Sequence, residues 1–180
     1  MATFEVPSRE EVNAQNQQIF DQLQSKVGMV PNIYATYAYS GTALSRYMQF
    51  ANGPSSLSNK ETEAINLVVS QVNGCTYCQA AHTGAAKQNG FTEDEILELR
   101  RGQAPFNTRL DALVKLAKSI ITHAGKVDER KVDQFLQAGY SKENLVDVVV
   151  AAGAKSITNY LHNLTDIPID FPEAPDLKEA

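Results

Sequence analysis

The sequence contains no tryptophan, and only two cysteines and three histidines occur among its 180 residues. Two cysteines can form at most one disulfide, so the chain cannot have the several bridges that stabilise small secreted domains. The two lie only three positions apart, and their pairing must have a local explanation. No apolar run approaches the roughly 20 residues that cross a bilayer, and the N-terminus lacks the basic and apolar regions of a signal peptide. We therefore expect a cytoplasmic protein without a membrane partner.

A basic stripe is also missing. The 16 lysines and arginines are scattered, and the formal net charge is -5. A protein that binds phosphate backbones would need its positive charge gathered on one face, so we expect no nucleic-acid partner. Apolar residues make up 43% of the chain and charged residues 21%, which is ordinary globular usage. A chain of this length is expected to form a single domain over residues 1–180.

Strict alternation of apolar and polar residues is absent, whereas a 3.6-residue rhythm recurs throughout, which predicts an all-α, single-domain helical bundle of about seven to eight helices. Ser58 with Glu61 and Thr92 with Glu95 form capping boxes that start two of these helices. The last helix is apolar nearly all round in its first half, so that half should lie in the core. The tail at 167–180 contains three prolines and is expected to be extended across the domain or a neighbour. The expected helices span residues 8–27, 31–51, 58–73, 76–89, 92–102, 107–124, 128–138 and 141–164.

Cys75 and Cys78 follow a glycine at the start of one of these helices. The amides and dipole at a helix N-terminus stabilise a thiolate, and CxxC spacing allows a reversible disulfide. The alternatives are a structural disulfide or half of a zinc site, which would need His82 together with His123 or His162 from distant helices. We favour redox chemistry and expect no bound metal.

His82 lies on the same helical face as both cysteines, at i+4 from Cys78. An imidazole there can take the proton of Cys78, which makes Cys78 the attacking thiol and Cys75 the resolving one. The opposite order stays open, because Cys75 is nearer the helix end. Glu63, on the preceding helix, could orient His82 or exchange protons with it if the two helices fold back on each other.

The run Glu63-x11-Cys75-x2-Cys78-x3-His82 resembles the alkylhydroperoxidase D-like branch of the carboxymuconolactone decarboxylase family, most specifically over residues 57–97. The resemblance implies that these four residues form a dithiol site with a proton relay, in an all-helical fold that assembles as a homotrimer or homohexamer. It also implies the reduction of peroxides. Some members carry a histidine immediately before the second cysteine, where this chain has Tyr77, so a relay step through that histidine is not expected here.

The sequence therefore predicts a thiol-dependent peroxidase that reduces small hydroperoxides through a cycle of Cys75 and Cys78, with Glu63 and His82 moving protons. It needs no bound cofactor, and its electron donor would be an external dithiol, either a lipoyl protein or a thioredoxin-like protein. Two alternatives remain. One is a lyase of the decarboxylase type, which does not need the cysteines, and the other is a non-enzymatic, redox-responsive oligomeric protein.

Overall fold

Helices make up all the regular secondary structure of the computed structural model, which describes residues 4–177. This confirms the all-α prediction, and within that range there are nine α-helices rather than seven to eight. A 3-10 helix, Arg9–Glu11, precedes them. The α-helices are α1 (Ala14–Val27), α2 (Asn32–Tyr37), α3 (Ala43–Ala51), α4 (Asn59–Val72), α5 (Thr76–Gln88), α6 (Glu93–Arg101), α7 (Thr108–Thr122), α8 (Glu129–Gln137) and α9 (Lys142–Thr165).

The extra helix arises because the segment expected as one helix over 31–51 is divided into α2 and α3. The side chain of Asn16, fully buried on α1, donates to the carbonyls of Ala38 and Ser40 at 3.1 Å. Asn13 donates to the carbonyl of Gly41, also at 3.1 Å. These carbonyls therefore bond to α1 instead of continuing a helix, a long-range effect that the local rhythm does not reveal.

The start of the first helix also differs from expectation. Ser8 caps only the 3-10 helix, and α1 begins six residues later, where the side chain of Asn13 accepts a hydrogen bond from the backbone N–H of Asn16. Both predicted capping boxes are present, at Ser58 with Glu61 and at Thr92 with Glu95. The local polar pattern therefore located these two N-termini correctly.

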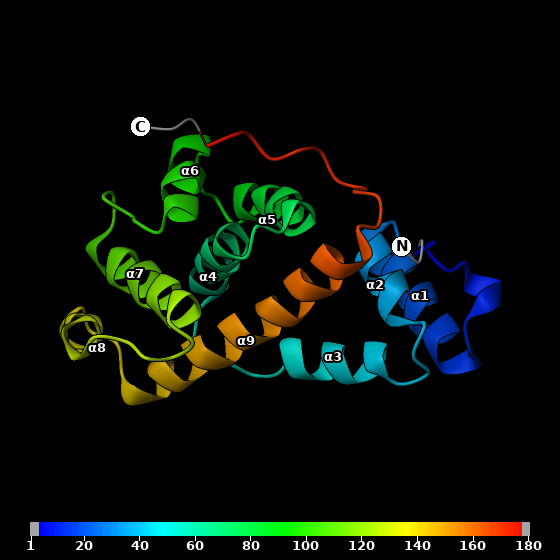
Figure 1. Cartoon of the computed structure of the whole chain (residues 1–180), viewed down its shortest axis with the longest axis horizontal. Coiled ribbons are helices and arrows are strands. Elements are labelled where there is room, and N and C mark those ends of the chain that lie inside the picture. The colour runs from blue at the N-terminus through cyan, green and yellow to red at the C-terminus, as the bar shows by residue number, and fades with distance from the viewer. Residues whose placement is uncertain (1–3, 178–180) are drawn as a thin grey trace.

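Helix α4 lies at the centre of the molecule, between α5, α7 and α9 (Figure 1). Its residues Ile65, Leu67 and Val68 are fully buried in a core that α4 builds with α6, α7, α8 and the first half of α9. A second core joins α1, α2 and α3 to the start of α5 and includes both cysteines. The dithiol motif is thus held where the N-terminal helices meet the central bundle.

Helix α9 departs from the prediction that its first half lies in the core. Val148 and Ala152 are buried, but Val146 is 62% exposed and Val149 is 51% exposed. The second half instead buries polar side chains, among them Lys155, as it passes the dithiol region. No helix within the described residues is long and apolar enough to cross a membrane.

Residues 167–177, the part of the tail that the structure describes, form no helix or strand. They run from the end of α9 back across the molecule to α6 (Figure 1). At its start the Asp170 carboxylate accepts from the backbone N–H of Asn32 at 2.7 Å. Further along, the buried Arg100 of α6 donates to the carbonyl of Pro175 at 2.5 Å. The tail is therefore tied to two distant parts of the chain.

Candidate active site

Cys75 and Cys78 sit on the first turn of α5. Gly74 takes a positive φ of 66°, which lets the chain turn sharply out of α4. Cys75 is the N-cap residue of α5, and its sulfur accepts the backbone N–H of Cys78 at 3.3 Å. Both thiols are buried, but only Cys78 lines an apolar cavity of about 490 Å³. A molecule in that cavity would meet Cys78 first.

The two thiols also differ in acidity. A hydrogen bond from Cys75 is the main cause that lowers the pKa of Cys78 to about 7; burial opposes it, and Lys155 and Asn159 assist. The same hydrogen bond, together with burial, raises the pKa of Cys75 above its ordinary value. Because the thiolate is the nucleophile, this arrangement favours Cys78 for attack and Cys75 for resolution.

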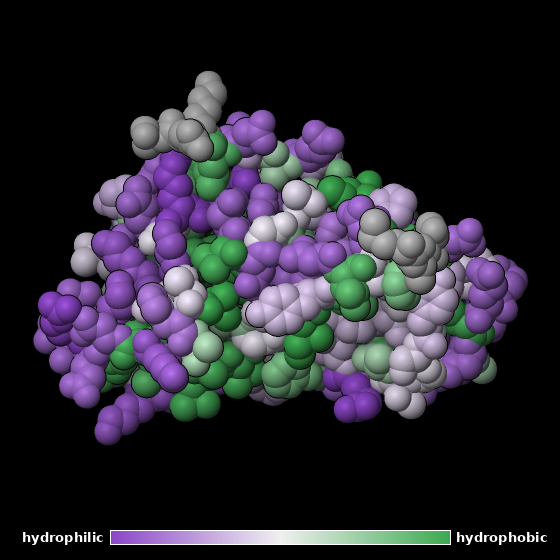
Figure 2. Space-filling model, in the orientation of Figure 1, coloured by the Kyte–Doolittle hydropathy of each residue, from purple (hydrophilic) through white to green (hydrophobic). Residues whose placement is uncertain are grey.

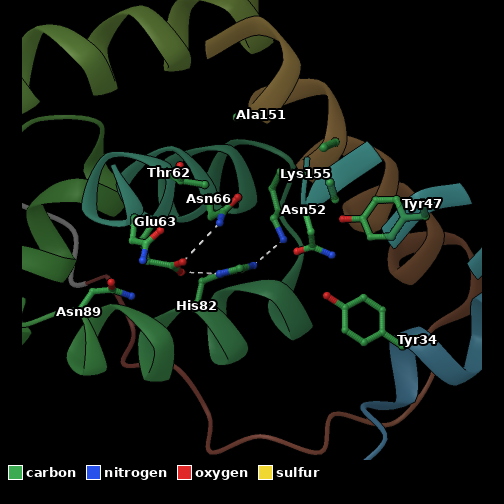
Figure 3. A pocket seen from close by; sticks show the side chains of 13 residues that line it. Tyr34, Tyr47, Asn52, Thr62, Glu63, Asn66, His82, Asn89, Ala151 and Lys155 are labelled. Atoms are coloured by element: carbon green, nitrogen blue, oxygen red, sulfur yellow. Dashed lines mark hydrogen bonds and ion pairs between the residues drawn. The ribbon is translucent and has the colours of Figure 1, made fainter. Parts of the chain in front are cut away.

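Glu63 and His82 are in direct contact, although 19 residues separate them. Helices α4 and α5 pack against each other, and Nδ1 of His82 lies 2.5 Å from Oε1 of Glu63. The other carboxylate oxygen accepts from the side-chain amide of Asn66 at 3.4 Å. Figure 3 shows Asn66 and His82 each joined to the Glu63 carboxylate by a dashed line. The fold thus supplies the antiparallel helix pair on which the role of Glu63 depends.

The other ring nitrogen of His82 faces Lys155 of α9, whose Nζ lies 2.5 Å from Nε2 (Figure 3). Within residues 4–177, neither ring nitrogen is hydrogen-bonded to Cys78, so the direct contact expected from their spacing is not formed. His82 and Cys78 do line the same apolar cavity.

Lys155 was missed by the sequence reasoning because 73 residues separate it from His82. A signal was available, since Lys155, Asn159 and His162 follow Val148 and Ala152 at spacings of three and four, on one face of the last helix. All five are buried. A lysine in phase with core positions would be costly to bury without a partner, and so it suggests a site.

The hydrogen bonds of His82 to Lys155 and Glu63 define which of its ring nitrogens carries the proton. An ammonium can only donate, so Nε2 of His82 accepts from Lys155, and the ring proton on Nδ1 goes to Glu63. Burial and the charge of Lys155 lower the pKa of His82, with Glu63 opposing them, and the ring is therefore neutral. Burial would raise the pKa of Glu63, but His82, Lys155 and Asn66 together keep it below its ordinary value.

A second cavity, of about 320 Å³, lies beside the first. Amide side chains give it a polar wall, and His82 and Lys155 line both cavities. Figure 3 shows Tyr34 and Tyr47 on the opposite side of this space from Glu63. The asparagines that line it are Asn52, Asn59, Asn66 and Asn89.

The other histidines have local partners. The ring of His162 is hydrogen-bonded to the carbonyl of Ile167 at 3.2 Å, and that of His123 to the carbonyl of Ser119 at 3.0 Å. Tyr77 packs against His162, with ring centroids 5.1 Å apart, and its hydroxyl accepts the N–H of Ile33. Among the described residues, no group of three or more histidine, cysteine, aspartate or glutamate side chains is placed to hold a metal ion.

Comparison with known proteins gives matches at both the sequence and the structural level. The sequence model of the carboxymuconolactone decarboxylase family matches residues 39–119. An uncharacterized protein of Bacillus subtilis, YdfG, is 27% identical over 119 residues, which is 65% of this chain and 81% of that protein.

Two solved structures are similar over nearly the whole chain. An uncharacterized peroxidase-related protein from Silicibacter is 25% identical, with a TM-score of 0.80 over 95% of this chain and 91% of the other. An alkylhydroperoxidase AhpD core protein from Ralstonia eutropha, also peroxidase-related, is 19% identical, with a TM-score of 0.84 over 93% of this chain and 91% of the other. The helical fold is therefore that of alkylhydroperoxidase D-like proteins.

Proposed function

Because the chain belongs to the alkylhydroperoxidase D-like branch of the carboxymuconolactone decarboxylase family, we propose that it is a thiol-dependent peroxidase. The observation that carries the proposal is the pairing of Cys78, in the wall of an apolar cavity, with Cys75 directly behind it. One thiol can reach a substrate, and the other can reach only its neighbour. That asymmetry suits a cycle of attack and resolution.

In the proposed cycle, the Cys78 thiolate attacks one oxygen of a hydroperoxide. The O–O bond breaks, a sulfenic acid forms on Cys78, and an alcohol leaves after gaining a proton. The thiol of Cys75 then attacks the sulfenic acid, which gives a disulfide and releases water. Glu63 and His82 serve as the proton relay. A lipoyl protein or a thioredoxin-like protein is the proposed reductant, and the protein needs no bound cofactor.

The test is steady-state consumption of an organic hydroperoxide in the presence of excess dithiol. We expect many turnovers per chain from the wild type and none from Cys78→Ser. In a separate assay without the dithiol, Cys75→Ser should reduce about one equivalent of peroxide and keep the sulfenic acid, because no second thiol of the chain can resolve it. A wild type that stops after one equivalent even with excess dithiol would instead indicate a redox-responsive protein without turnover. If lyase activity toward a lactone acid survives in both cysteine variants, the decarboxylase alternative holds.

We also propose that the protein assembles as a homotrimer or homohexamer, through α9. Figure 2, in the orientation of Figure 1, shows hydrophobic side chains gathered along the lower edge of the molecule, over the first half of α9. Exposed apolar positions continue along α9 at helical spacing, a pattern that a monomer would leave facing water. They are Val146, Val149, Val150, Ile157, Tyr160 and Leu164.

A further inference from the structure

Lys155 is a buried cation to which the dithiol cycle gives no role. Lys155 is only 8% exposed, and within residues 4–177 its ammonium has one hydrogen bond, to Nε2 of His82. An ammonium carries three donors, so two of its N–H groups are left for other acceptors. A buried charge normally has its hydrogen bonds completed. The two remaining donors can therefore bond an acceptor atom of a ligand in either of the cavities that Lys155 lines.

The position of Lys155 shows which side chains a ligand bound to it would contact. Lys155 lines the apolar cavity together with Cys78 and also lines the polar cavity beside it. On its far side, His82 connects it to the Glu63 carboxylate through two hydrogen bonds of 2.5 Å. Glu63 and His82 thus hold Lys155 in place, whereas no hydrogen bond joins His82 to Cys78 within the described residues.

We propose that Lys155 is a catalytic residue of this site, whose ammonium stabilises the Cys78 thiolate and then gives a proton to the oxygen that leaves the hydroperoxide. The proposal rests on the peroxidase function proposed above. It places Lys155 between the relay and the dithiol, so that Glu63 and His82 act on Cys78 through Lys155.

Cys78 first loses its proton to water. Its thiolate then forms an S–O bond with the terminal oxygen of ROOH while the O–O bond breaks, so sulfur is oxidised and the peroxide reduced. The leaving RO⁻ takes a proton from the Lys155 ammonium and departs as ROH. The neutral amine of Lys155 regains a proton from water in the polar cavity, which replaces the one that Cys78 released.

Several ionisable groups surround Cys78, and any pH profile of this thiol reports on all of them. Helix α5 and its N-cap contribute Cys75, Tyr77 and His82, and α9 contributes Lys155, the one cation among them. The remaining groups are Glu63 of α4, the half-buried Tyr34 of α2, and the buried Tyr37 and Tyr47 of α2 and α3.

The test uses two readouts on the full reduced chain. Alkylation of Cys78 by iodoacetamide, followed by mass spectrometry across a range of pH, reports the thiolate without any peroxide. Consumption of an organic hydroperoxide with excess dithiol reports turnover. The variants are Lys155→Met, which removes the charge, and Lys155→Gln, which keeps an N–H donor for His82 but no ionisable proton. Lys126→Met, in the exposed loop between α7 and α8, is the matched control.

We expect both Lys155 variants to move the midpoint of Cys78 alkylation upward by about one pH unit. Peroxide consumption should fall by about 100-fold. The control should match the wild type in both assays. If Lys155→Met does not fold by circular dichroism, Lys155→Gln decides.

A folded Lys155→Gln with the wild-type midpoint and turnover would overturn the proposal while leaving the peroxidase function intact. A wild type that consumes no peroxide would refute the peroxidase function and the proton transfer to a leaving oxygen. In that case the alkylation profile still tests the first part of the proposal, because an unmoved midpoint excludes Lys155 as the cation that stabilises the Cys78 thiolate.

Discussion

Cys75 and Cys78 have different surroundings although only two residues separate them. Cys75 is the N-cap of α5 and lies behind Cys78, away from the lining of the apolar cavity. Cys78 lies in the wall of that cavity, and the pKa of its thiol is lowered to about 7, first by the hydrogen bond from Cys75. Half of the Cys78 thiols would thus be ionised near neutral pH, whereas an ordinary cysteine thiol has a pKa of roughly 8.5.

Replacing Cys75 by alanine removes the donor that contributes most to this lowering. The pKa of Cys78 should then rise toward the ordinary value, and alkylation of Cys78 at pH 7 should slow by about tenfold, as the thiolate fraction falls. Stopped samples analysed by mass spectrometry give the rate. Cys75→Ser, which keeps an O–H donor at this position, should be slowed much less. Equal rates for the alanine variant and the wild type would show that the hydrogen bond does not control the acidity of Cys78.

His82 makes the folded state sensitive to acid. Burial and Lys155 lower its pKa, so the folded ring stays neutral at a pH at which the ring of the unfolded chain, with a pKa of roughly 6.5, is already protonated. Unfolding therefore takes up a proton, and the stabilisation is fully present above that unfolded value and is lost as the pH falls below it. The pKa of Glu63 is also lowered, which adds a loss at more acidic pH, below the range of an ordinary glutamate.

We expect the free energy of unfolding, from urea titrations, to be smaller at pH 5.5 than at pH 7.5. His82→Gln lacks the titrating ring, so its stability should change less over the same interval. If both proteins lose stability equally, the acid sensitivity comes from groups other than His82.

Helix α4 shows how a local signal positions the site. Ser58 accepts the N–H of Glu61 at 3.3 Å, and the carboxylate of Glu61 accepts the N–H of Ser58 at 2.8 Å. With its start set in this way, α4 presents Glu63 toward His82 and ends just before Cys75.

Ser58→Ala should lower the free energy of unfolding by about 1 kcal/mol, because the hydroxyl no longer satisfies an amide of the first turn. Urea unfolding at pH 7.5 measures the change. Ser25→Ala, at an exposed position inside α1, is the control and should leave stability within about 0.5 kcal/mol of the wild type. A cost as small as that of the control would show that α4 does not depend on its capping box.

Over the whole molecule, the N-terminal helices and the tail close around the start of α5. Ile33 of α2 donates its N–H to the hydroxyl of Tyr77 at 3.2 Å, and the ring of Phe171 meets the ring of Tyr77 edge-on at 5.5 Å. Ile33, Tyr77 and Phe171 all line the apolar cavity. Tyr77, at the position where some relatives have a histidine, therefore contributes to the packing of the cavity wall.

The exposed apolar stripe of α9 leads to a prediction about assembly. Leu164→Glu, at a position that is 78% exposed, should shift the protein toward a monomer, because a carboxylate would have to be buried in the interface. Multi-angle light scattering after size exclusion measures the mass. Gln134→Glu, on the exposed side of α8, adds the same charge elsewhere and should not change it. A wild type that is already monomeric would refute the proposed trimer or hexamer.

Much of the fold could be predicted from the sequence because the relevant signals are local. The helical rhythm, the capping boxes at Ser58 and Thr92 and the prolines of the tail act within a few residues of themselves. The placement of Cys75 and Cys78 on the first turn of a helix has the same origin.

Contacts between distant segments could be decided only by the tertiary structure. Asn13 and Asn16 divide α2 from α3 by binding carbonyls more than 20 residues away. Lys155 lies 73 residues from His82 in the chain and contacts Nε2 of the imidazole that the helical spacing had paired with Cys78. Helical periodicity tells which side chains share a face of one helix, but which helix packs against that face depends on the path of the whole chain.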